Sequence, residues 1–124
     1  MTLFEECKEA LRSNFSVVAP SDQKEVVDLL HKYFLSDGNV AWSEMEYSDY
    51  RDIDELLNDN DFKNVSVFVF ADDKDIPIFV TKLNLIADNI YDVTALSPKL
   101  FIFNEKIILQ PLFPTEEIRL GIKN

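Results

Sequence analysis

The segment NVSVFVFAD, residues 64–72, is the clearest β-strand in the sequence. β-branched and aromatic residues fill it, and the acidic turn DDKD at 72–75 follows directly. The segments on either side of this strand indicate what kind of sheet it joins.

After the turn, residues 77–91 are ambiguous between strand and helix, and we expect a helix because Pro77 suits a first helical position. Three further strands are expected at 92–104, 106–113 and 117–122, and the short links between them suggest hairpins. Before the strand at 64–72, the pattern predicts helices at 3–14, 22–35 and 49–58 and a short strand at 40–46. Thr2 and Glu5 form a capping box for the first helix.

The chain of 124 residues, 47% of them hydrophobic, is suited to one domain with one core. We therefore expect a single domain over 1–124 of the α+β class. In it, the N-terminal helices pack on one face of a mostly antiparallel β-sheet of about four to five strands.

Negative charge is concentrated in the middle of the chain. The formal charge is −2 over residues 1–36, −9 over 37–75 and zero over 76–124, which totals −11. Eight of the nineteen residues in EMEYSDYRDIDELLNDNDF, 44–62, are acidic. Such a field repels nucleic acid and anionic membranes and attracts basic partners. A surface that only aids solubility is the simpler interpretation, but spreading the acids along the chain would serve that purpose better.

Several kinds of site are disfavoured. The two glycines form no phosphate-binding loop, and the single cysteine excludes an internal disulfide. Neither an EF-hand nor a zinc site has its ligand pattern, so no metal or cofactor is expected. We interpret Cys7 as a buried structural residue and His31 as a surface or half-buried one. No signal peptide or membrane span is recognisable, so a cytoplasmic location is expected.

The expected function is the binding of a basic partner. On a helix over 49–58, Asp52, Glu55 and Asp59 lie opposite the apolar side and are expected to steer and pair with Lys or Arg. Two aromatic residues, Trp42 and Tyr47, are the candidate anchors. The remaining predicted contact residues extend the field: Asp49, Asp54, Asp61, Asp72, Asp73 and Asp75.

Residues 66–103, SVFVFADDKDIPIFVTKLNLIADNIYDVTALSPKLFIF, followed by EIRLGI, resemble immunity proteins of bacterial polymorphic-toxin systems. The similarity is to those of contact-dependent growth inhibition (CDI). The resemblance implies a cytosolic protein without enzymatic activity that neutralises a cognate toxin domain by covering its active site. Many such toxins are nucleases with basic grooves, and RNase A-like toxins are one class to consider.

Two alternatives of other classes remain open. One is an acidic regulator or nucleic-acid mimic that binds an endogenous basic protein, and the other is a small enzyme or metal-binding domain. The gene neighbourhood separates the first from an immunity protein, which should lie beside a large exported toxin gene. Titration calorimetry with Ca²⁺, Mg²⁺ and Zn²⁺ tests the second.

Overall fold

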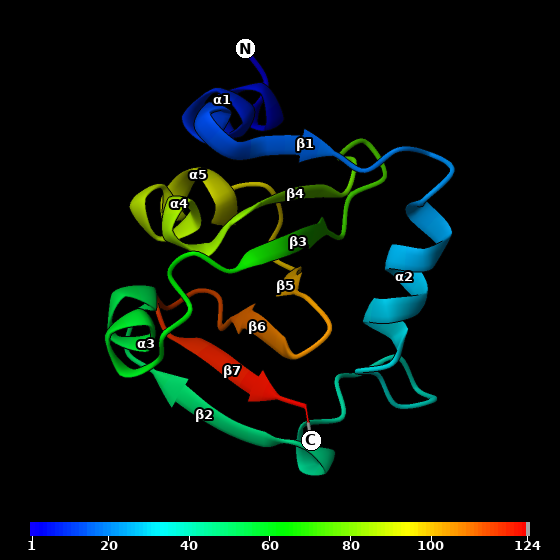
Figure 1. Cartoon of the computed structure of the whole chain (residues 1–124), viewed down its shortest axis with the longest axis vertical. Helices are drawn as coiled ribbons and strands as arrows, with labels where there is room; N and C mark the ends of the chain where they lie inside the picture. Colours follow the sequence, from blue (N-terminus) through cyan, green and yellow to red (C-terminus); the bar gives the residue numbers. More distant parts are fainter. Residues whose placement is uncertain (124) are drawn as a thin grey trace.

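The computed structural model describes residues 1–123, which form an α+β fold built on a seven-stranded antiparallel sheet (Figure 1). The strand order is β1-β4-β3-β5-β6-β7-β2. The strands are β1 (Phe15–Val17), β2 (Glu46–Tyr50), β3 (Ser66–Ala71), β4 (Phe79–Lys82), β5 (Leu100–Phe103), β6 (Ile107–Pro111) and β7 (Ile118–Ile122). The helices are α1 (Leu3–Ala10), α2 (Gln23–His31), α3 (Ile53–Asp59), α4 (Leu83–Asp88) and α5 (Ile90–Thr94), with 3-10 turns at Arg12–Asn14 and Trp42–Glu44.

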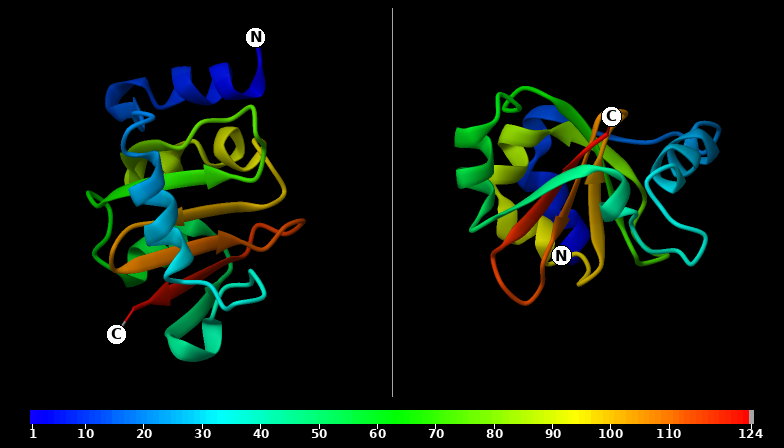
Figure 2. Two further views of the ribbon diagram at one scale, coloured as in Figure 1. Left: turned by 90° about the vertical axis from the view of Figure 1, so that its right-hand side faces the viewer. Right: turned by 90° about the horizontal axis from the view of Figure 1, so that it is seen from below.

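The interior strand β3 is apolar on both faces. Val67 and Val69 belong to one core with α1, α3, α4 and α5, whereas Phe68 and Phe70 pack against a second core with α2. Figure 2 shows α2 on one side of the sheet and α3 and α4 on the other. A sheet that carries apolar residues on both faces must be covered on both. The expectation of helices on one face only is therefore wrong, although the α+β class is confirmed.

The sheet is also larger than expected because two short strands were not recognised. β1 pairs with β4 through Phe15 and Thr81, and β4 pairs with β3 through Thr81 and Val67. Phe79 and Thr81 are fully buried. The segment 77–91 was expected to be one helix, but its first part is β4, and α4 and α5 follow. Alternating burial over Phe79–Lys82 fits a strand, and tertiary pairing here overrides the helical spacing.

The segment 40–58 is organised differently from the expectation. The strand lies at Glu46–Tyr50, not at 40–46, and pairs with β7 at the edge of the sheet. The helix begins at Ile53, because Asp52 is extended and its side chain accepts a hydrogen bond from the backbone of Glu55. Asp is a preferred N-cap residue, so Asp52 is the last residue of the link between β2 and α3. Asp49 is consequently a strand residue.

The N-terminal helix is anchored as expected. Thr2 and Glu5 form both hydrogen bonds of the capping box, and Cys7 is fully buried in the first core. His31 is exposed at the end of α2. Among residues 1–123, no helix is long and apolar enough to cross a bilayer.

Candidate functional site

The structure divides the eleven predicted contact residues among three separate places. Trp42, Tyr47 and Asp49 lie on β2 and the turn before it. Asp52, Asp54, Glu55, Asp59 and Asp61 lie on or beside α3. Asp72, Asp73 and Asp75 lie in the turn between β3 and β4. These places do not form one continuous surface.

The sheet separates the first group from the second. Tyr50 packs against the first core with α3, and alternation along β2 turns Tyr47 and Asp49 toward the opposite face. Trp42 packs against the second core. The third group lies beyond the far end of β3, whose six residues span roughly 20 Å.

The first group is organised around Arg119 of β7. The guanidinium of Arg119 binds Asp49 with both arms, at 2.6 Å from Nε to Oδ1 and 3.0 Å from Nη2 to Oδ2. Its carbon lies 5.4 Å from the ring centroid of Trp42 and 5.0 Å from that of Tyr47. The hydrogen bond from Arg119 lowers the pKa of Asp49. Asp49 therefore adds little to the negative field, and this group forms an aromatic surface on which Tyr47 is 50% exposed.

Gly121 allows Trp42 to lie over the sheet. A Cβ built on Gly121 would lie 2.9 Å from Cζ3 of Trp42, 3.0 Å from Sδ of Met45 and 3.2 Å from Cγ2 of Ile108. Contacts this close require the neighbouring side chains to shift. The absence of a side chain at position 121 thus positions one predicted anchor.

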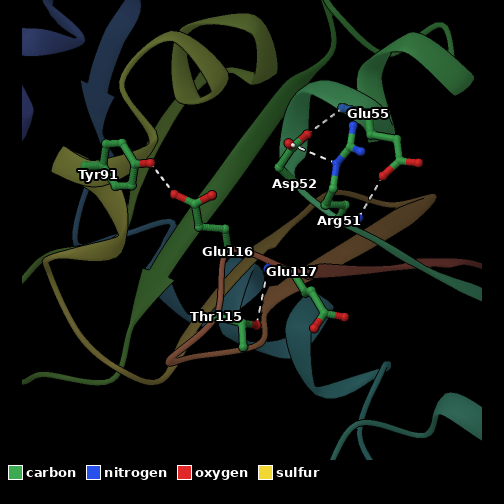
Figure 3. A network of polar contacts seen from close by, with 7 residues as sticks. All are labelled: Arg51, Asp52, Glu55, Tyr91, Thr115, Glu116 and Glu117. Carbon is green, nitrogen blue, oxygen red and sulfur yellow. Dashed lines mark hydrogen bonds and ion pairs between the residues drawn. The ribbon is translucent and has the colours of Figure 1, made fainter.

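Some acids of the second group make hydrogen bonds at the start and end of α3, and Figure 3 shows those at the start. The side chain of Asp52 accepts from the Glu55 N–H at 2.9 Å, and the Glu55 side chain accepts from the Arg51 N–H at 2.8 Å. The Tyr50 hydroxyl donates to Asp59 at 2.8 Å. Arg51 lies 3.7 Å from Asp52, which is a weak ion pair between largely exposed groups. These contacts satisfy local backbone and hydroxyl groups and leave most of the carboxylate charge uncompensated.

The start of α3 also forms one wall of an acidic hollow of about 360 Å³. The other walls are the junction between α4 and α5 and one residue of the loop between β6 and β7. Its acidic lining residues are Asp52, Asp54, Asp88, Asp92 and Glu116, and its lining includes no Lys or Arg. The hollow is therefore the place where carboxylates from distant parts of the chain meet, and the Asp52 carboxylate among them has a weak partner in Arg51 at 3.7 Å.

Tyr91 stands at the rim of this hollow and is 70% exposed. Its hydroxyl donates a hydrogen bond to the carboxylate of Glu116, as Figure 3 shows, and that bond raises the pKa of Tyr91. The bond joins α5 to the loop between β6 and β7, which fixes one edge of the hollow.

Three of the five hollow acids were missed because the last third of the chain has no net charge. Four of its five acids gather away from its five bases: Asp88, Asp92, Glu116 and Glu117 line the hollow or the groove beside it, and neither lining contains Lys or Arg. The pairing of Tyr50 with Ile118 brings Asp52 close to Glu116. Only the register of β2 on β7 reveals this proximity, and no spacing in the sequence gives it.

The chemistry of the arrangement suits positively charged groups, and its geometry does not resemble a chelating centre. Within residues 1–123, no three His, Cys, Asp or Glu side chains converge as the ligands of a metal ion would. Cys7 lies in the core, where burial raises the pKa of its thiol to about 12. Carboxylates spread around an open hollow are suited to several Lys or Arg side chains of a macromolecular partner.

A sequence model of the family described as CdiI immunity protein EcoliA0-like matches residues 1–121. No curated protein matches the chain. The family match extends well beyond the segment 66–122 on which the resemblance was based, and it confirms that resemblance. The chain therefore belongs to the EcoliA0-like family of CdiI immunity proteins.

Proposed function

We propose that this protein binds a cognate toxin domain, a basic nuclease, and blocks its active site with the acidic surface around the hollow. Membership of an immunity protein family suggests toxin inhibition. The observation that carries the finer proposal is the hollow itself, where five carboxylates gather with no base in the lining. In this function the protein acts in the cytoplasm, catalyses no reaction and needs no cofactor.

Electrostatic physics supports a basic partner. Carboxylates that share a small volume repel one another, and cations that approach relieve this repulsion. Complementary charge raises the rate of association by a factor of about 10 to 10³. Salt screens the attraction and so reduces this increase. A nuclease domain carries basic residues where it holds phosphates, so its substrate groove is the cationic surface that this hollow fits best.

The three groups of predicted contacts have different roles in the proposal. Asp52 and Asp54 line the hollow, while Glu55, Asp59 and Asp61 extend its field along α3. Tyr47 and Trp42, with the neutralised Asp49, form a second contact surface on the opposite face of the sheet. Asp72, Asp73 and Asp75 act only through the long-range field, because they lie beyond the far end of β3.

The test uses the toxin domain encoded immediately upstream of this protein's gene. The wild-type protein should bind that domain and abolish its nuclease activity at a stoichiometric ratio. The triple variant Asp54→Asn, Asp88→Asn, Asp92→Asn removes three negative charges from the hollow and none of the hydrogen bonds described above. We expect it to need at least about 10-fold more protein for the same inhibition.

A control removes two charges at a distance from both proposed contact surfaces. Glu25→Gln with Asp28→Asn on α2 should inhibit as the wild type does, because these two residues line a separate groove with Phe68 and Glu105 that includes no residue of the hollow and neither Trp42 nor Tyr47. Failure of the wild-type protein to bind the upstream domain would refute the proposed function. Binding with no difference between the hollow variant and the control would refute the role of the hollow.

A further inference from the structure

An apolar groove of about 180 Å³ adjoins the acidic hollow. It lies between α5 and the loop that joins β6 to β7, and its walls include Ile53, Ile90, Pro111, Pro114 and Ile118. We call it the hairpin groove. Glu116 and Glu117 also line it, which places two carboxylates beside an apolar floor.

Phe113 at this groove is unusual in the molecule. The chain has ten phenylalanines, all within the described residues, and Phe113 alone is exposed, at 65%. Tyr91, which is 70% exposed, lines the same groove. Burying a Phe side chain is favourable relative to leaving it in water, because it removes a large apolar area from the solvent. The fold buries the other nine phenylalanine side chains wholly or in part and gains stability from them. Phe113 stays available to a partner.

The loop that carries Phe113 is held by its own hydrogen bonds. Leu112 N–H donates to the Glu117 carbonyl at 2.8 Å, and the Thr115 hydroxyl donates to the Leu112 carbonyl at 2.7 Å. The Glu117 N–H donates to the Thr115 hydroxyl oxygen at 3.3 Å, and Figure 3 shows this turn beside Glu116. A loop with internal bonds loses less conformational entropy on binding than a loose one.

The groove and the hollow form one surface. Ile53, Ile90, Tyr91 and Glu116 line both of them. Apolar area with aromatic residues is therefore flanked by the carboxylates of the hollow on one side and by Glu117 on the other. An apolar centre inside a charged rim is the usual composition of a protein–protein contact surface. Aromatic residues at such a centre carry a large share of binding energy.

We propose that the hairpin groove receives one apolar side chain of the toxin domain, flanked on the toxin by Lys or Arg residues that enter the acidic hollow. A cavity of about 150 Å³ holds one benzene ring, so a groove of about 180 Å³ fits a single Leu, Ile, Met or Phe side chain. This inference rests on the proposed function and names the contact that gives the complex its lifetime.

A second copy of this chain is the wrong occupant on charge grounds. The net charge of −11 and the acidic rim would place carboxylates against carboxylates in a dimer formed through this surface. Like charges brought together at an interface are destabilising. A cationic segment with an apolar side chain satisfies both the rim and the floor.

The test is the kinetics of binding of the upstream toxin domain to wild type, Phe113→Ala and Leu35→Ala. Leu35 is a matched exposed apolar residue, 41% exposed, away from the groove. We expect Phe113→Ala to raise the dissociation rate at least about 10-fold while the association rate and its salt dependence stay unchanged. Leu35→Ala should leave both rates unchanged.

A variant of the rim completes the test. Glu117→Gln should lower the association rate and reduce its salt dependence, with little change in the dissociation rate. If the wild type binds the toxin domain and Phe113→Ala binds it with the same rates, the groove inference is wrong and the proposed function stands. If the wild type forms a dimer that Phe113→Ala abolishes, the groove inference is wrong and the groove is a surface for self-association. No binding by the wild type would refute the proposed function itself.

Discussion

Substituting Gly121 with Ala tests how the aromatic surface is held. The backbone of Gly121 is not in the left-handed region, so an alanine meets no conformational strain there. Without a clash, this change would stabilise the protein by about 0.4–1 kcal/mol, because it restricts the unfolded chain. The sign of the effect is therefore decided by packing.

The added methyl group would meet three side chains at once. Its closest contacts are 2.9 Å to Trp42, 3.0 Å to Met45 and 3.2 Å to Ile108, whereas carbon atoms pack at about 3.5–4.0 Å. Overpacking of this kind costs about 1–3 kcal/mol. We expect a net destabilisation of about 1–2 kcal/mol, which lowers the melting temperature by roughly 3–8 °C.

Two measurements check this expectation. Thermal unfolding gives the change in stability, and fluorescence reports on the displacement of Trp42, since the chain contains one tryptophan. Gly38→Ala is the matched control, because Gly38 has a φ of 87° and no atom within 4 Å of an added Cβ. The control should lose about 1 kcal/mol through backbone strain and keep the wild-type emission. A Gly121→Ala protein with unchanged emission and equal or higher stability would refute the packing argument.

Three further predictions concern the scaffold. Thr2→Ala removes the capping box of α1 and should cost about 1 kcal/mol, measured by chemical denaturation; an unchanged midpoint would contradict the role of the box. The hydrogen bond from Arg119 lowers the pKa of Asp49 in the folded protein. This bond therefore stabilises the protein fully at pH values above the ordinary Asp pKa, near 4, and its contribution is lost as the pH falls through the lowered pKa. Asp49→Asn should therefore lose up to about 1 kcal/mol at pH 7 and show a weaker loss of stability on acidification than the wild type; parallel pH profiles would argue against it. Cys7, with a pKa of about 12 in the core, should react with a thiol reagent at pH 8 only after unfolding, and rapid labelling of the native protein would show that the site is open.

The parts of the fold that sequence predicts are those set by local chemistry. The β-branched and aromatic residues around Val67 and Val69 identify β3, and Thr2 with Glu5 identifies the start of α1. β4 was missed because Phe79 and Thr81 take strand geometry only through pairing with β3 and β1. A short apolar run has no period of its own that separates strand from helix.

The candidate site was only partly predictable for a related reason. The clustering of acids around α3 identified Asp52 and Asp54, which line the hollow. Asp88, Asp92 and Glu116 come from a segment without net charge, and only the packing of α4 and α5 and the register of β2 on β7 bring them to the same place. Asp49 seemed equivalent to its neighbours in sequence but is neutralised by Arg119, because strand pairing sets Arg119 opposite it. Charge counted along a chain does not reveal such separation in space.

The most direct test of the central claim is the association rate with the upstream toxin domain, measured by stopped flow at low and high ionic strength. At low salt, the variant Asp54→Asn, Asp88→Asn, Asp92→Asn should associate on the order of 10-fold more slowly than the wild type, and Glu25→Gln with Asp28→Asn should match the wild type. In 1 M salt, where the screening length is about 3 Å, the three rates should converge. Equal rates for the hollow variant and the wild type at low salt would contradict the claim that this acidic hollow recognises the toxin.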